Sequence, residues 1–237
     1  MNRYFENISI KKTVILISII TAIFRAVCAF LLELGNDEVY YWCYAMFPSL
    51  SHFDHPPMVG LLIQTTTGGM IFDSELFIRL SSVAIGSINT WLMYIICRMI
   101  KDEITGLYAA LMYTASIYCS VIVGTMIMPD TPLSTFFLLG MYFMHESIIV
   151  KHDSTNKEGT HLRNHALMLA GLFTGMAMLS KYTAVFLWIG YGLYILLYNR
   201  KELKNPYLYL SVLISAVCFL PVIIWNYNND FISFTFH

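Results

Sequence analysis

Charged residues are scarce in this sequence. Asp, Glu, Lys and Arg make up 12% of its 237 residues, about half of the roughly 25% found in soluble domains. Hydrophobic residues supply 57% and the mean hydropathy is +0.63. Such a chain has too few charges to cover a water-facing globule, and its hydrophobicity excludes a disordered chain. The composition therefore predicts an integral membrane protein.

Two further patterns are missing. The net charge of -1 leaves no basic surface for phosphates, which excludes a nucleic-acid partner. The five cysteines lie apart and form no CxxC pair, so the sequence predicts neither a zinc knuckle nor a disulfide framework.

Long apolar runs dominate what is present. A spanning helix needs about 20 mostly apolar residues, and we expect seven spans, at 14–34, 76–97, 104–128, 132–150, 166–180, 182–198 and 207–225. The first run is too long for the apolar part of a signal peptide and has no small-residue cleavage site, so we interpret it as a retained signal anchor. The predicted fold class is an all-α, polytopic transmembrane bundle.

The fifth and sixth runs are separated only by Lys181. One helix over 166–198 would be roughly 50 Å long, whereas the hydrocarbon core is about 30 Å thick. We therefore expect a hairpin with Lys181 at its apex. Eleven of the 14 basic residues then lie on one side, which the positive-inside rule makes the cytoplasmic side, together with the N-terminus. Arg25, Arg79 and Lys181 are the exceptions.

Carboxylates gather on the opposite side, where the expected topology places Asp37, Glu38, Asp54, Asp73, Glu75, Asp130 and Asp230. The longest segment there is 35–75, a first extracytoplasmic loop whose apolar stretch 58–72 is short enough to lie in the interface. Asp37 and Glu38 open this loop and are followed by Tyr40 and Tyr41. They are either functional residues or a helix start with an aromatic belt.

The motif HFDHPPM holds Asp54 and His55 ahead of two prolines that stiffen the backbone. Carboxylate and imidazole are ligand types for Mg, Mn or Zn, and Asp130 in MPDTPL offers a third carboxylate on the same side. The alternatives are a rigid polar turn at Asp54 and a helix N-cap at Asp130.

Lys181 and Arg79 are the cationic candidates. A cation at membrane depth is costly unless it is paired or reaches the surface, and it is interpreted first as a functional residue. A guanidinium suits phosphate oxygens. Simple snorkelling to the interface is the competing explanation for both side chains.

Six motifs occur in order: DEVYYW, HFDHPPM, FIRL, MPDTPL, GMAMLSKYTAVFL and LPVIIWNYNNDFISFTFH. In this order the chain resembles the GT-C glycosyltransferases of the protein-mannosyltransferase and aminoarabinose-transferase superfamily, particularly bacterial family 39-like proteins. The resemblance implies one transmembrane glycosyltransferase domain over 1–237. Because members continue with further spans, we expect an N-terminal portion of a longer protein.

The resemblance also implies a function: transfer of a sugar, with inversion, from a polyprenyl-phosphate-linked donor to a lipid, glycan or protein acceptor outside the plasma membrane. It makes Asp37 the general base with Glu38 beside it. It places Asp54 and Asp130 where relatives bind a divalent cation or orient substrate, and Lys181 near the donor phosphate.

The other candidate substrate contacts are His55, which replaces a lysine of some relatives, Arg79, Tyr40 and Tyr41. No nucleotide cofactor is expected. The competing hypotheses are a transporter or flippase that binds a polyprenyl phosphate, and a donor-binding fragment without activity. Broken helices meeting at the bilayer midplane are typical of transporters, whereas these acids lie at the outer rim.

Overall fold

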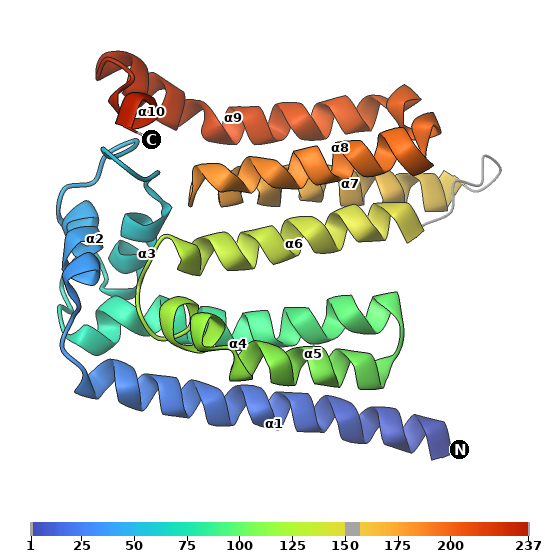
Figure 1. The fold of residues 1–237 in the computed structure, drawn as a ribbon, viewed down its shortest axis with the longest axis horizontal. Coiled ribbons are helices and arrows are strands. Elements are labelled where there is room, and N and C mark those ends of the chain that lie inside the picture. Colours follow the sequence, from blue (N-terminus) through green and yellow to red (C-terminus); the bar gives the residue numbers. More distant parts are fainter. Residues whose placement is uncertain (1, 150–156, 237) are drawn as a thin grey trace. The chain divides into compact units, whose positions relative to one another are not determined.

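The computed structural model describes residues 2–149 and 157–236, and this part of the chain contains helices and turns but no strand. The helices are α1 (Asn2–Leu31), α2 (Asn36–Met46), α3 (Met58–Thr66), α4 (Glu75–Ile100), α5 (Glu103–Ala115), α6 (Asp130–Ile149), α7 (Lys157–Met178), α8 (Phe186–Tyr198), α9 (Pro206–Asn228) and α10 (Ile232–Phe236) (Figure 1). The predicted all-α class is confirmed. Val150, the last residue of the fourth expected span, lies outside the described residues.

The chain divides into two compact units. The first comprises Met1–Pro48 and Val59–Thr135, and the second comprises Ser49–Met58 and Phe136–His237. α6 begins in the first unit and continues in the second. The HFDHPPM motif belongs to the second unit, although it lies between α2 and α3 in the sequence.

Three helical stretches in the described residues are long and apolar enough to cross a membrane: Ser9–Leu31, Glu75–Ile100 and Pro206–Asn228. The α1 side chains Ile23 and Phe24 are 61% and 69% exposed. Apolar side chains exposed in rows along a helix need apolar surroundings, which a bilayer supplies. The protein is therefore an integral membrane protein, and the total of seven spans stays a prediction.

The third expected span is not one continuous helix. α5 ends at Ala115, Ser116 has an extended backbone (φ −68°, ψ 123°), and a separate π-helical turn follows at Tyr118–Val123. The Ser120 hydroxyl donates to the carbonyl of Thr114. This side-chain bond takes an acceptor at the end of α5 and so competes with continuation of the helix. The prediction of a single helix over 104–128 was wrong for this reason.

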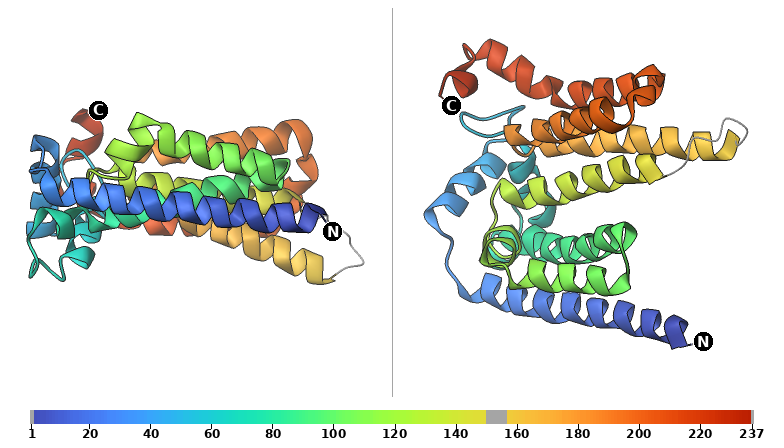
Figure 2. Two further views of the ribbon diagram at one scale, coloured as in Figure 1. Left: turned by 90° about the horizontal axis from the view of Figure 1, so that it is seen from below. Right: turned by 45° about the vertical axis from the view of Figure 1, so that its right-hand side comes forward.

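α1, α4 and α5 lie side by side in the first unit (Figures 1 and 2). Arg25, in the middle of α1, is only 2% exposed. Its Nη2 donates to the Ser120 hydroxyl oxygen at 3.4 Å. Gly86 and Gly124 make room for it, because a Cβ on either would lie 2.7 or 2.9 Å from a guanidinium nitrogen. The mid-span cation therefore faces protein.

In the second unit the expected hairpin is confirmed. α7 ends at Met178, Lys181 lies in the connection, and a 3₁₀ turn at Tyr182–Val185 leads into α8. Leu167 and Ala170 of α7 share a buried apolar cluster with Leu187, Tyr191 and Ile195 of α8.

α7 and α9 approach closely at a GxxxG pair, Gly171 and Gly175. A Cβ on Gly171 would lie 2.3 Å from the Ser211 carbonyl oxygen, and one on Gly175 would lie 3.0 Å from the Cα of Ser215. Small residues at this spacing let two backbones touch. The contact is reinforced by Ser215, whose hydroxyl donates to the Gly171 carbonyl at 2.6 Å.

Candidate active site

The two adjacent acids at the start of α2 have different surroundings. Glu38 is fully buried. Its Oε1 accepts from Arg79 Nε at 2.7 Å, and its Oε2 accepts from Arg79 Nη2 at 2.6 Å. The same Oε2 accepts from the Gly35 backbone N–H at 2.9 Å, which closes the first turn of α2.

Arg79 makes three more hydrogen bonds. Nη1 donates to the carbonyls of Ala29 and Leu32, at 3.2 and 2.6 Å, and Nη2 donates to that of Glu33 at 2.8 Å. A guanidinium has five N–H donors, and all five are used within the first unit. Arg79 thus joins the start of α4 to the end of α1 and the start of α2. It has no donor left for a substrate, in contrast to the role expected from the sequence.

Glu38 also reaches a distant segment, since its Oε1 accepts from the backbone N–H of Ile127 at 3.0 Å. Burial raises the pKa of Glu38, but the hydrogen bonds from Arg79, Gly35 and Ile127 outweigh burial, so that the pKa lies below its usual value. The ionised carboxylate accepts four hydrogen bonds inside the protein. Glu38 is consequently not available as a base, although the sequence placed it beside Asp37 as a catalytic residue.

Asp37 is exposed in the first turn of α2. Within the described part of the chain it makes no hydrogen bond or ion pair. Neighbouring helix residues point about 100° apart, so the buried position of Glu38 turns Asp37 outward. The two predicted aromatic contacts also differ. Tyr40 is 41% exposed, whereas Tyr41 lies in the core of the first unit and is 7% exposed.

Asp130 is the first residue of α6 and is half-buried. Its Oδ1 accepts a hydrogen bond from the Tyr118 hydroxyl at 2.7 Å. Because Ile127 is bonded to Glu38, the segment that leads into Asp130 is fastened to the start of α2. The structure therefore brings together the DEVYYW, FIRL and MPDTPL motifs in the first unit.

The second unit brings together the other motifs. Met58 of the HFDHPPM turn donates its backbone N–H to the Leu179 carbonyl at 3.2 Å, two residues before Lys181. The Ser233 hydroxyl of α10 donates to the His52 carbonyl at 3.1 Å. Lys181 is half-buried in the turn between α7 and the 3₁₀ segment.

Two histidines flank Asp54 in this turn. His55 Nδ1 lies 3.1 Å from Asp54 Oδ2. Burial lowers the pKa of His52 to about 4, against an opposing effect of Asp54. His52 is therefore neutral at physiological pH.

The donors expected for a divalent cation are divided between the two units, and a cation bound by them stays a prediction. Asp54 and His55 are in contact with each other in the second unit, while Asp130 is bonded to Tyr118 in the first unit. Across residues 2–149 and 157–236, no group of three or more His, Cys, Asp or Glu side chains is positioned to hold a metal ion.

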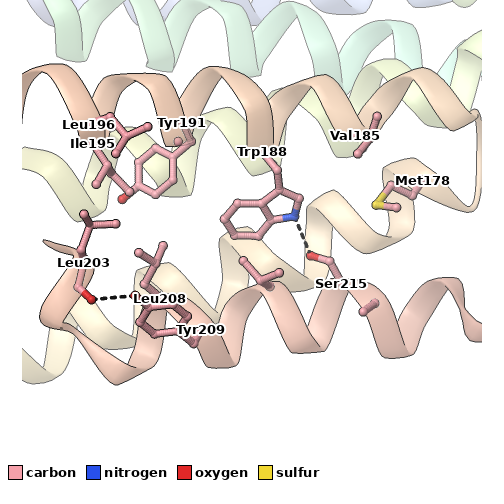
Figure 3. Close-up of a pocket in the computed structure, with 13 residues that line it drawn as sticks. Met178, Val185, Trp188, Tyr191, Ile195, Leu196, Leu203, Leu208, Tyr209 and Ser215 are labelled. Atoms are coloured by element: carbon pink, nitrogen blue, oxygen red, sulfur yellow. Dashed lines mark hydrogen bonds between the residues drawn. The ribbon is translucent and has the colours of Figure 1, made fainter. Parts of the chain in front are cut away.

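An apolar groove between α8 and α9 was not foreseen from the sequence (Figure 3). Its volume is about 440 Å³, and Trp188 spans it, donating from Nε1 to the Ser215 hydroxyl at 3.0 Å. Met178 and Val185 line it close to Lys181 in the sequence. The signal in the sequence was Trp188 and Tyr191 on one helix, which is equally typical of core or belt aromatics.

A comparison with known protein families identifies the family of this chain. Residues 54–225 match the family of dolichyl-phosphate-mannose-protein mannosyltransferases. The chain belongs to this family. It is also similar to lipid A galacturonosyltransferase RgtD of Rhizobium johnstonii (strain DSM 114642 / LMG 32736 / 3841), with 24% identity over 199 residues, covering 82% of this chain and 38% of that protein. No solved structure matches the chain.

Membership of this mannosyltransferase family confirms the resemblance to GT-C glycosyltransferases and favours a transferase over a transporter. The matched region includes Asp54, Arg79, Asp130 and Lys181, whereas Asp37 precedes it. The chain spans less than half the length of the relative that it matches.

Proposed function

We propose that this member of the mannosyltransferase family transfers a sugar from a polyprenyl-phosphate-linked donor to a lipid, glycan or protein hydroxyl on the outer side of the plasma membrane. The observation that carries the proposal is the contrast between Asp37 and Glu38. One acid is buried and saturated with hydrogen bonds, and its neighbour is exposed on the same rigid helix start.

Asp37 acts as the general base in this proposal. It takes the proton of the acceptor hydroxyl while the oxygen attacks the anomeric carbon. The bond from that carbon to the donor phosphate breaks, and its electron pair leaves with the phosphate. A lipid phosphate is a competent leaving group, so no acid is required, unlike glycoside hydrolysis with its two carboxyl groups. The displacement inverts the anomeric centre.

Lys181 is the proposed contact of the donor phosphate, because an ammonium stabilises the negative charge that grows on the leaving group. The groove of Figure 3 supports a lipid-linked donor. It is apolar along α8 and α9, and its Met178 and Val185 end adjoins the lysine in the chain. An isoprenoid chain and a phosphate match this combination. His55 and Tyr40 are proposed as sugar contacts.

The family match shows the transferase class, and an activity assay tests the role of Asp37. In the full-length protein we expect Asp37→Asn to lower the transfer rate by about 10²- to 10⁴-fold without changing the midpoint of thermal unfolding. Asp73→Asn, also exposed in the same loop, is the matched control and should transfer normally. A folded Asp37→Asn protein with normal activity would contradict the assignment.

A divalent cation remains a separate proposal for Asp54 and Asp130. Transfer that is lost in EDTA and restored by Mg²⁺, Mn²⁺ or Zn²⁺ would support it. Unchanged transfer in EDTA would contradict a role for the cation.

A further inference from the structure

A second, polar cavity lies among residues of α7 and the α8–α9 connection. Its volume is about 570 Å³, and its charged lining residues are Arg163, Lys201, Glu202 and Lys204. The connection is a 3₁₀ turn, Arg200–Lys204, that is separated from the end of α8 by Asn199. Lys181 precedes α8 and this turn comes after it, so a 13-residue helix separates the cavity from the proposed contact of the donor phosphate.

The one acid among these lining residues is already engaged. Glu202 is 6% exposed, and its Oε2 lies 3.6 Å from Arg163 Nη1. Its Oε1 accepts a hydrogen bond from Asn205 Nδ2 at 2.7 Å. The lining thus retains two exposed ammonium groups, those of Lys201 and Lys204, and carries a net positive charge.

One nitrogen of Arg163 has no acceptor among the described residues. Its Nε is buried and has no hydrogen-bond partner in the described part of the protein. A buried N–H of a charged group without a partner is destabilising. Arg163 lines the cavity, and an anion there would balance the excess of positive charge.

The position of the cavity indicates the source of the anion. Pro206 and Tyr207 line its edge, and they are the first residues of α9, which is long and apolar enough to cross a membrane. The end of such a helix lies at the depth of the lipid headgroups. Basic pockets between helices at this depth suit phosphate headgroups.

We propose that this cavity binds the phosphate of an anionic phospholipid headgroup, in the leaflet opposite the proposed transfer site. The phosphate oxygens pair with the exposed ammonium groups of Lys201 and Lys204, and the Arg163 charge adds to the attraction. This site requires none of the residues assigned to sugar transfer. The competing explanation is that the lysines only orient the protein by the positive-inside rule.

The test uses the purified full-length protein in a neutral detergent. Dioctanoyl-phosphatidylglycerol, dioctanoyl-phosphatidylcholine and inorganic phosphate are titrated separately, and the midpoint of thermal unfolding is followed, because a ligand of the native state raises it. The variant is Lys201→Gln with Lys204→Gln. The control is Lys12→Gln with Lys101→Gln, which removes the same charge from the first unit.

We expect phosphatidylglycerol to raise the midpoint of the unchanged protein and the control at equal concentrations, whereas phosphatidylcholine has no such effect. The variant should need roughly tenfold more phosphatidylglycerol, since each surface lysine contributes measurably to anionic lipid binding. Equal responses of variant and control would overturn the proposal. Saturation by inorganic phosphate alone would contradict the lipid assignment.

Discussion

Arg79 and Glu38, which are 41 residues apart, form a two-point ion pair at 2.7 and 2.6 Å inside the first unit. Both side chains are at most 3% exposed. The pair connects α1, α2, α4 and the segment before α6, because the remaining bonds of both groups go to backbone atoms of these parts. It sets the direction in which Asp37 faces.

Removing one partner of this pair should be costly. We expect Arg79→Gln to lower the free energy of unfolding by about 3–5 kcal/mol, because it leaves the Glu38 charge buried and unpaired. Arg98→Gln on the same helix is the control. Its pair with Glu103 is longer, 3.5 Å, and Arg98 is 34% exposed, so the loss there should be about 1 kcal/mol or less. Equal free energies of unfolding for the two variants would refute the structural role of the Arg79–Glu38 pair.

The contact of α7 with α9 predicts a second stability difference. Gly171→Ala would push a methyl group against the Ser211 backbone. We expect it to lower the free energy of unfolding by about 1–3 kcal/mol. Gly190→Ala on α8 is the control, because beyond its own helix backbone nothing lies within 4 Å of the position that a Cβ would take. The control should unfold at the same temperature or higher, since Ala favours helix. Thermal unfolding in detergent measures both.

His52 predicts a pH dependence. Its pKa in the folded protein is about 4, below the ordinary value near 6.5. The unfolded chain therefore binds more protons between these values, and the stabilising contribution is present above pH 6.5 and is lost as the pH falls toward 4. We expect the unfolding midpoint of the unchanged protein to fall more steeply over this range than that of His52→Asn. Parallel pH profiles would exclude this contribution.

The groove between α8 and α9 can be filled by mutation. Val212 lines it, and Val212→Trp should raise the KM for a long-chain polyprenyl-phosphate sugar by about tenfold, which corresponds to roughly 1.4 kcal/mol of lost contact. A donor with a short isoprenoid chain should be used normally. Leu213→Trp, on the next residue of the same exposed helix, is the control. An equal rise in KM for both donors would show that the isoprenoid chain does not bind in this groove.

Many features were predictable from local composition. The apolar runs located the longer helices, and the length of 166–198 required the hairpin at Lys181, because helix rise and bilayer thickness are general constants. The prediction of one continuous helix over 104–128 was wrong because Ser116 and Ser120 bond to the backbone, a competition that hydropathy does not record. The close contact of Gly171 with α9 was not predicted, because a local pattern does not identify the partner helix.

Only the tertiary structure determines the directions in which the Asp37 and Glu38 side chains point. Asp37 and Glu38 are adjacent carboxylates with similar chemistry, and nothing local distinguishes a base from a buried anchor. Arg79 and the Ile127 N–H, both distant in the chain, bind one of them and leave the other exposed. Composition and order of motifs were thus sufficient for the membrane fold and the family. The separate roles of the two acids arise from long-range packing, because a hydrogen bond selects its partner by position in space.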